Sequence, residues 1–162
     1  MKEHRLELSY QVADKSESLP EEDRALIKAA TEAAMRAYAP YSQFRVGAAV
    51  RLDDGRLVSG NNQENAAYPS GICAERVALF YASSQHPGAK ISKIAIYSPD
   101  TPKGAEFPVT PCGSCRQVMA EYEGMQDHEI EVLLVSESGS IWKFSGVSQF
   151  LPFTFNSKSL KG

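Results

Sequence analysis

The three cysteines of the chain each stand at the start of a predicted helix, and their spacing restricts the possible folds strongly. Cys73 begins the segment Cys-Ala-Glu, and Cys112 and Cys115 form a Cys-x-x-Cys pair later in the chain. Such a pair at a helix start places two sulfurs on one turn, where both reach one metal ion. The third sulfur joins them only if the two helix starts face each other. An odd number of cysteines in a chain without a predicted signal segment argues against a disulfide framework.

The ligand set predicts a catalytic zinc site. Zinc prefers four nitrogen or sulfur ligands, and a catalytic site leaves one position open for water. The chain has three cysteines, and none of its three histidines lies close to a cysteine in the sequence. We therefore expect Cys73, Cys112 and Cys115 to bind Zn²⁺ and to leave the fourth position free.

Glu75 lies two residues after Cys73, within reach of that open position. A carboxylate there can take a proton from the water and pass it on.

The three thiolates carry excess negative charge, which two helix N-termini, each with roughly half a positive charge, would offset. Arg76 and Arg116 lie close to the ligands in the sequence and could donate hydrogen bonds to the sulfurs.

Simpler interpretations of these residues remain open at this point. Free cysteines are common buried hydrophobic residues, and a Cys-x-x-Cys pair can be a redox pair. A glutamate near a helix start is often a surface residue that the helix dipole favours.

The order of predicted elements indicates an α/β fold. We expect a helix between Pro20 and Pro40 and another from Cys73, and a third helix begins near Gly113. Strands are predicted at 45–52, 56–60, 91–97, 130–135 and 140–144, with a loop at 99–111 and a short helix near 147–151. This alternation predicts a three-layer α/β/α domain with a mixed central sheet of about five strands.

Polar and acidic residues at 14–24 separate an N-terminal arm, residues 1–20, from a single domain, residues 21–162. Within the arm, Leu6, Leu8, Tyr10 and Val12 alternate with polar residues. This pattern predicts a short strand or an arm that packs on a neighbouring molecule.

Charge and hydropathy restrict the partners. The formal net charge is −3 and no run of Lys or Arg occurs, whereas polynucleotide binding usually needs a basic surface. No window approaches the ~18 consecutive apolar residues of a membrane span, and the N-terminus has no apolar signal region. We therefore expect a cytoplasmic protein with a small substrate, and neither a polynucleotide nor a membrane as partner.

Five motifs in order give the sequence a specific family resemblance, over about residues 21–156. They are Tyr41–Ala49 (YSQFRVGAA), Asn62–Tyr68 (NQENAAY), Cys73–Arg76 (CAER), Pro111–Gln117 (PCGSCRQ) and Leu151–Phe155 (LPFTF). With them the chain resembles the cytidine deaminases, specifically the short-chain homotetrameric type with three cysteine zinc ligands.

The resemblance implies a reaction. Cytidine and deoxycytidine would be hydrolysed to uridine and deoxyuridine plus ammonia, a step of pyrimidine salvage. Cys73, Cys112 and Cys115 would bind zinc, and Arg76 would hydrogen-bond the thiolates. Glu75 would carry protons from the water to N3 of the base and then to the leaving ammonia.

The resemblance also implies substrate contacts and a homotetramer with shared active sites. Asn62 and Glu64 would hold the ribose hydroxyls, and Phe44 would pack on the base. The backbone of Ala74 and the main chain near Cys112 would read the pyrimidine edge. Phe155 would reach the site of a neighbouring subunit. Without the resemblance, these would be core aromatics, a turn residue and a solvated loop charge.

Three features depart from the family pattern: Asn61 stands where many relatives have a further cysteine, loop 101–110 is longer than in the shortest relatives, and arm 1–20 has no counterpart.

Alternative functions are a deaminase of a modified cytosine, such as the blasticidin type, and a polynucleotide-editing deaminase. A structural zinc module or an inactive relative is the alternative from a different class.

Overall fold

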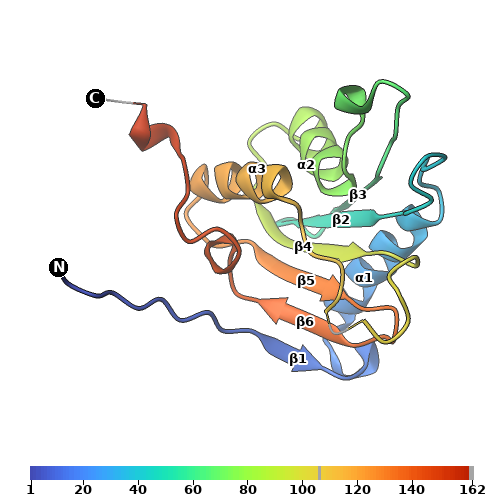
Figure 1. The fold of residues 1–162 in the computed structure, drawn as a ribbon, viewed down its shortest axis with the longest axis horizontal. Helices are drawn as coiled ribbons and strands as arrows, with labels where there is room; N and C mark the ends of the chain where they lie inside the picture. Colours follow the sequence, from blue (N-terminus) through green and yellow to red (C-terminus); the bar gives the residue numbers. More distant parts are fainter. Residues whose placement is uncertain (106, 161–162) are drawn as a thin grey trace.

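The computed structural model describes residues 1–105 and 107–160. Residue 106, in the predicted loop 101–110, and residues 161 and 162, at the end of the predicted domain, lie outside it. The described part contains one six-stranded sheet, with α-helices on both faces (Figure 1). The three-layer α/β/α prediction is therefore confirmed.

The sheet is mixed, with the strand order β1-β6-β5-β4-β2-β3. Its strands are β1 (Gln11–Ala13), β2 (Gly47–Leu52), β3 (Leu57–Asn61), β4 (Ile91–Tyr97), β5 (Glu131–Val135) and β6 (Ile141–Phe144). Only the central pair, β4 and β5, runs parallel, and the other neighbours are antiparallel. Because helix α3 lies in the chain between β4 and β5, this crossover brings the start of α3 to the edge where the site forms.

The sixth strand, beyond the predicted number of about five, comes from the N-terminal arm. Gln11 pairs with Lys143 and Ala13 with Ile141, so β1 extends the sheet beyond β6. Just before it, the ring of Tyr10 stacks on Trp142, with 4.5 Å between ring centroids. The alternation in the arm predicted a short strand or an arm that packs on a neighbouring molecule, and the strand is confirmed for Gln11–Ala13 alone.

The two faces of the sheet are covered by different helices. Helix α1 (Glu21–Ala34) buries Leu26 and Ala30 against Ala49, Ala95 and Leu133 on one face. Helices α2 (Ala74–Gln85) and α3 (Gly113–Gly124) cover the other face, and their side chains share one buried cluster with alternate residues of β2, β4 and β5. Since side chains alternate along a strand, each strand supplies both cores.

Two glycines allow the helices to approach the sheet closely. A Cβ atom on Gly47, at the start of β2, would lie 2.0 Å from the carbonyl oxygen of Ala30 in α1. A Cβ atom on Gly60 in β3 would lie 2.6 Å from the backbone nitrogen of Ala78 in α2. Both distances are shorter than any tolerated contact, so these positions fix how α1 and α2 pack on the hairpin.

Helix α1 ends at Ala34, earlier than the boundary expected from Pro40. The amide nitrogen of the Asn61 side chain donates to the carbonyl oxygen of Ala33, 3.0 Å away. The backbone of Tyr38 then bonds with that of Asn62 and Glu64. These contacts satisfy the helix end and lead the chain to residues 62–64, so the segment before Pro40 is not helical. The predicted helix near 147–151 is a short 3-10 helix, Val147–Gln149.

None of the helices in the described ranges combines the length and the apolar character that crossing a membrane requires.

Candidate active site

The N-termini of α2 and α3 face each other across the cysteine cluster. Cys73 is the N-cap residue of α2, Cys112 is the N-cap residue of α3, and Cys115 lies in the first turn of α3. Their three sulfur atoms all lie within 4.8 Å of one another. The Sγ atoms of Cys73 and Cys112 are 3.9 Å apart.

These distances fit a zinc ion. Four tetrahedral ligands with Zn–S bonds of about 2.3 Å place neighbouring sulfurs about 3.8 Å apart. Cys115 is buried, Cys73 is half-buried and Cys112 is exposed, so the cluster is accessible from one side. Three protein ligands with access from solvent are typical of a catalytic site. The cysteines at 73, 112 and 115 are the residues that would hold the ion.

Hydrogen bonds favour a thiolate at Cys73. The thiol of Cys115 and the guanidinium of Arg76 both donate to this sulfur, and they lower the pKa of Cys73 to about 5. The Arg76 Nη2 to Sγ distance is 3.7 Å. The pKa of Cys115 is raised, because its hydrogen is shared with Cys73 and because the side chain is buried. The N-terminus of α2 also favours negative charge at this position.

Glu75 lies in the first turn of α2, and its side chain is 5% exposed. Burial raises the pKa of its carboxyl group, and the negative charge of Cys73 acts in the same direction. A carboxyl group with a raised pKa can hold a proton near neutral pH and release it again. The site therefore contains an acid–base group beside the sulfurs.

Arg116 does not contact the sulfurs, so that expectation was wrong. Its Nε donates to the carbonyl oxygen of Pro111 at 2.8 Å, and its Nη1 donates to that of Phe150 at 3.3 Å. The guanidinium also lies 5.9 Å from the centroid of the Phe150 ring. Arg116 instead fixes the approach of the chain to α3.

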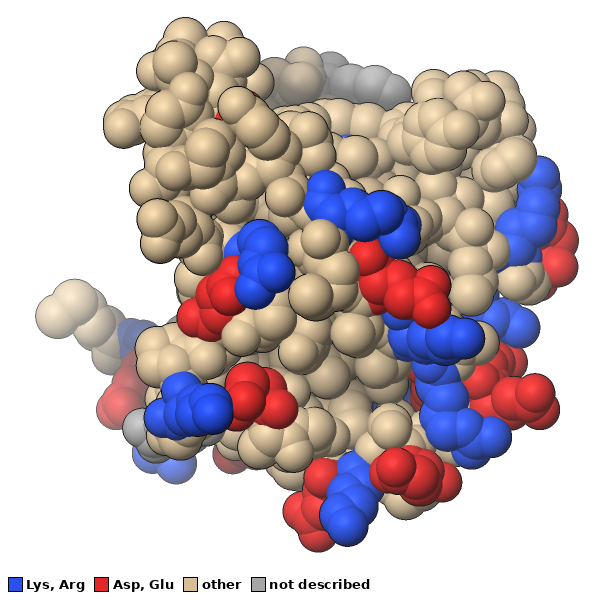
Figure 2. All heavy atoms as spheres, turned by 90° about the vertical axis from the view of Figure 1, so that its right-hand side faces the viewer, with Lys and Arg blue, Asp and Glu red and all other residues tan. Residues whose placement is uncertain are grey.

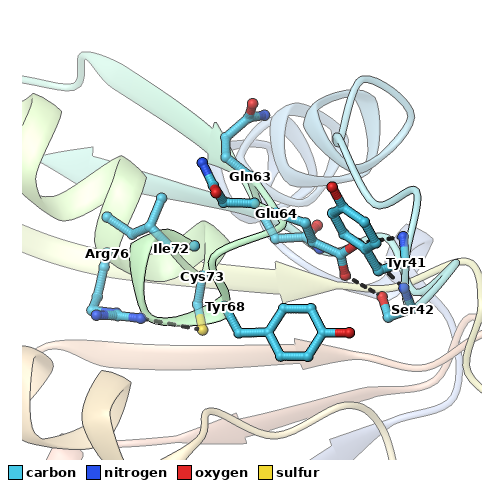
Figure 3. A pocket seen from close by; sticks show the side chains of 11 residues that line it. Tyr41, Ser42, Gln63, Glu64, Tyr68, Ile72, Cys73 and Arg76 are labelled. Carbon is cyan, nitrogen blue, oxygen red and sulfur yellow. Dashed lines mark hydrogen bonds between the residues drawn. The ribbon is translucent and has the colours of Figure 1, made fainter.

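A cavity of about 500 Å³ opens beside Cys73 (Figure 3). This volume lies in the usual range for small-molecule sites. The cavity is lined by Tyr41, Ser42, Asn62, Gln63, Glu64, Asn65, Tyr68, Gly71, Ile72, Cys73 and Arg76. Three chain segments meet there: the loop before β2, the loop after β3, and the start of α2.

Glu64 is held by the loop before β2. Its carboxylate accepts hydrogen bonds from the backbone nitrogens of Tyr41 (2.8 Å) and Ser42 (3.2 Å) and from the hydroxyl group of Ser42, as Figure 3 shows. The Ser42 hydroxyl and these two amides lower the pKa of Glu64. The carboxylate is therefore ionised at neutral pH and fixed in the wall of the cavity.

Asn62 also lines the cavity and braces the same loop. Its Oδ1 accepts from the backbone nitrogen of Val46 at 2.7 Å, and its Nδ2 donates to the carbonyl oxygen of Phe44 at 2.9 Å. Both polar ends of the amide are thus engaged with the chain that enters β2. This bracing was not anticipated, because the amide was assigned only to the substrate.

The other predicted substrate residues lie farther from the cavity. Phe44 is half-buried and Ala74 is fully buried, and neither lines the cavity. Phe155 is 60% exposed in the C-terminal tail, where its carbonyl oxygen accepts from the side chain of Gln117 at 2.7 Å. The structure therefore brings together the cysteines, Arg76, Asn62 and Glu64, and leaves Phe155 on the surface.

Two aromatic residues of the cavity wall were missed. Tyr41 and Tyr68 meet edge to face, with 6.0 Å between ring centroids, and both line the cavity. Each stands at one end of a motif that carried the family resemblance. That position was the available signal, but nothing in the sequence places the two rings in contact.

Comparisons with known proteins agree with this geometry. Residues 20–128 match the family model of the cytidine and deoxycytidylate deaminase zinc-binding region. A cytidine deaminase of Halalkalibacterium halodurans is 42% identical over 135 residues, which cover 83% of this chain and 95% of that protein. One of Mycobacterium tuberculosis is 39% identical over 116 residues, covering 69% and 83%.

Solved structures show the same similarity. The crystal structure of a cytidine deaminase from Burkholderia pseudomallei superposes with a TM-score of 0.71 at 42% identity, covering 82% of this chain and 98% of that one. The cytidine deaminase of Mycobacterium tuberculosis gives a TM-score of 0.62 at 35% identity, covering 82% and 95%. Together with the cluster of three cysteines, these matches show that the chain belongs to the cytidine deaminase family of zinc-binding hydrolases.

Proposed function

We propose that this deaminase hydrolyses both cytidine and deoxycytidine, releasing ammonia, as a step of pyrimidine salvage in the cytoplasm. The observation that carries the proposal is the juxtaposition of three sulfurs, a buried carboxyl group and a cavity of nucleoside size.

Zinc, when bound by the three cysteines, supplies a Lewis acid that makes a water molecule a better nucleophile at neutral pH. The remaining work belongs to the protein. Glu75 takes one proton from the attacking water and delivers it to N3 of the pyrimidine, which makes C4 more electrophilic. It then transfers the second proton to the amino group, which leaves as ammonia. The raised pKa of Glu75 supports this role, because the same carboxyl group must accept and release protons.

The contacts of Glu64 support activity on both sugars. An ionised carboxylate accepts about four hydrogen bonds, and Tyr41 and Ser42 already donate three to Glu64. One acceptor position remains for a sugar hydroxyl. The 3′-hydroxyl group, which ribose and deoxyribose share, can fill it, so loss of the 2′-hydroxyl leaves no buried acceptor unpaired.

We propose a homotetramer in which Phe155 completes a neighbouring site. The C-terminal tail leaves the body of the domain (Figure 1), and Phe153 and Phe155 on it are 83% and 60% exposed. Large aromatic side chains on an extended tail are typical of contacts between subunits. We also keep Phe44 and the backbone of Ala74 as proposed contacts of the base, to be tested by substitution of Phe44.

The surface gives little support to a polynucleotide as substrate. On the face that Figure 2 shows, acidic and basic side chains lie next to one another, and they form no continuous basic area. A groove for single strands usually combines a basic track with stacking aromatics.

An ultraviolet assay with cytidine, deoxycytidine, cytosine, a blasticidin-type nucleoside and single-stranded DNA tests the proposal. We expect turnover of the first two only. Turnover of the modified cytosine alone, or of DNA in a salt-sensitive manner, would replace the proposal with one of those activities. Zinc content without turnover of any compound would indicate an inactive relative.

A further inference from the structure

Arg45 and Asp100 form a fork-like ion pair at the edge of the site. The Nε of Arg45 lies 2.9 Å from one carboxylate oxygen of Asp100, and its Nη2 lies 2.8 Å from the other. The backbone nitrogen of Arg45 donates a third hydrogen bond to Asp100, at 2.8 Å. Both side chains are partly exposed. Bidentate arginine–carboxylate pairs fix geometry better than single contacts do.

This pair acts on a segment that is already held from the other side. Phe44, Arg45 and Val46 lead directly into β2. The amide of Asn62 binds the carbonyl oxygen of Phe44 and the backbone nitrogen of Val46, whereas Asp100 binds the backbone nitrogen of Arg45 between them. Along an extended chain, the backbone groups of successive residues point to opposite edges. Asn62 therefore holds this segment from one edge and Asp100 from the other.

Asp100 is itself anchored near the core. Its backbone nitrogen donates to the hydroxyl oxygen of Ser98 at 3.2 Å, and Ser98 is fully buried just after β4. The sequence that follows leads to Cys112. The position of Asp100 is therefore set by the sheet, and the segment that it begins leads to a proposed zinc ligand.

The pair joins the two sides of the site. The loop before β2 supplies Tyr41 and Ser42 to the cavity, and its other bonds go mainly to residues 62–64. Over the described ranges, every hydrogen bond between segment 38–46 and segment 98–111 comes from Arg45 and Asp100. Beyond the end of the β2–β4 ladder, at the pair Gly47 and Tyr97, these are the hydrogen bonds that join the two segments in the described part of the chain.

We propose that Arg45 and Asp100 are positioning residues for deamination, which hold the substrate-side loop before β2 in register with the loop that leads to Cys112. The inference rests on the proposed function and deepens it. Neither residue touches the metal ligands, so each would act only through the position of the loops. The same contacts lower the pKa of Asp100 and raise that of Arg45, so the pair stays ionised at neutral pH.

Kinetics of Arg45→Ala, Asp100→Ala and the double variant test this role. The zinc ligands and Glu75 lie on α2 and α3, so zinc content is expected to be unchanged. We expect each single variant to raise the KM for cytidine about tenfold and to lower kcat by no more than about threefold, because a misplaced loop weakens substrate binding most. The double variant should resemble either single variant, because the two residues act as one unit.

Two further variants separate positioning from general stability. Arg56→Ala breaks a comparable ion pair with Asp54 at the far end of the same hairpin and should leave both constants unchanged. Arg45→Lys keeps the charge without the fork and should restore KM only partly. Hydrogen exchange, measured without substrate, should speed up in peptides covering 38–46 and 98–105 in Arg45→Ala but not in Arg56→Ala.

Several results would overturn the proposal: wild-type KM in Arg45→Ala, additive effects in the double variant, an equal effect of Arg56→Ala, or unchanged exchange in both loops. If the wild-type protein fails to deaminate cytidine, the proposed function fails instead. The exchange experiment still tests the link between the loops in that case.

Discussion

The guanidinium of Arg76 donates a hydrogen bond to the sulfur of Cys73 from one turn further along α2, across 3.7 Å. After the hydrogen bond from Cys115, which has the larger effect, this contact lowers the pKa of Cys73, and it offsets the negative charge of the thiolates. Because partners of metal ligands typically contribute 10–100-fold to metal affinity, Arg76→Ala should weaken zinc binding by about tenfold. Competition with a chromogenic chelator measures this loss. Arg36→Ala, a change at an exposed arginine, should bind zinc like the wild-type protein. Equal zinc affinities of the wild-type protein, Arg76→Ala and Arg36→Ala would contradict the role of Arg76.

Glu75→Gln separates proton transfer from metal binding. The amide keeps the size of the side chain but cannot carry a proton, and the three cysteines that would bind zinc stay in place. We expect the variant to retain zinc, as metal analysis would show, and to lose turnover by about 10³-fold. Near-wild-type turnover would show that another group moves the protons.

Gly47→Ala should damage the fold rather than the chemistry. The added methyl group would meet the carbonyl oxygen of Ala30 at 2.0 Å and the backbone nitrogen of Ala34 at 2.4 Å, so α1 must move away from β2. We expect the free energy of unfolding to fall by about 3 kcal/mol. Denaturant melts measure it.

The matched control for that change is Gly124→Ala. A Cβ atom on Gly124 would have no atom within 4 Å among the described residues outside its own helix and chain neighbours, and the residue ends helix α3. Its stability should be unchanged or slightly higher, since alanine favours helix. A similar loss in both variants would mean that close packing at Gly47 is not the cause.

Much of the site was predictable because its chemistry is local in the sequence. A Cys-x-x-Cys pair at a helix start lies on one turn, and Cys73 precedes a helical pattern, so the sequence predicts two helix starts that carry three sulfurs. The structure adds their proximity, with 3.9 Å between the sulfurs of Cys73 and Cys112. That distance depends on the sheet order, which hydrophobic periodicity does not determine.

The unpredicted features are contacts between distant residues. Arg45 and Asp100 are 55 positions apart, and nothing in either segment indicates that they meet. Arg116 follows a ligand directly, yet it donates to the backbone carbonyls of Pro111 and Phe150. Adjacency in sequence therefore predicted the role of Arg76 but not that of Arg116, because the contact with Phe150 joins residues 34 positions apart.

A charged network at the start of α1 should make stability depend on acid pH. A hydrogen bond from Lys93, and then the charges of Lys93 and Arg51, lower the pKa of Glu22. A carboxyl group with a lowered folded-state pKa stabilises the protein fully above its unfolded value, near pH 4 to 5. This contribution is lost as pH falls further, through the folded-state pKa.

Glu22→Gln tests that dependence. Because Glu22 is partly exposed, the variant should lose less than about 1 kcal/mol at pH 7. Its stability should then decline less steeply than that of the wild-type protein between pH 5 and pH 3. Thermal melts across this range measure the difference, and parallel curves for the two proteins would contradict the assignment.

The N-terminal arm offers a test of the proposed boundary between arm 1–20 and domain 21–162. Trp142, the single tryptophan of the chain, stacks under Tyr10 with an interplanar angle of 14°. Tyr10→Ala removes this contact and should lower the free energy of unfolding by about 1 kcal/mol, with a change in tryptophan emission. Because Tyr10 and Trp142 do not line the cavity beside Cys73, kcat/KM for cytidine should stay at the wild-type value. Leu8→Ala, at an exposed position, serves as the control with unchanged emission. Lost deamination in a folded Tyr10→Ala protein would instead make the arm part of the catalytic unit.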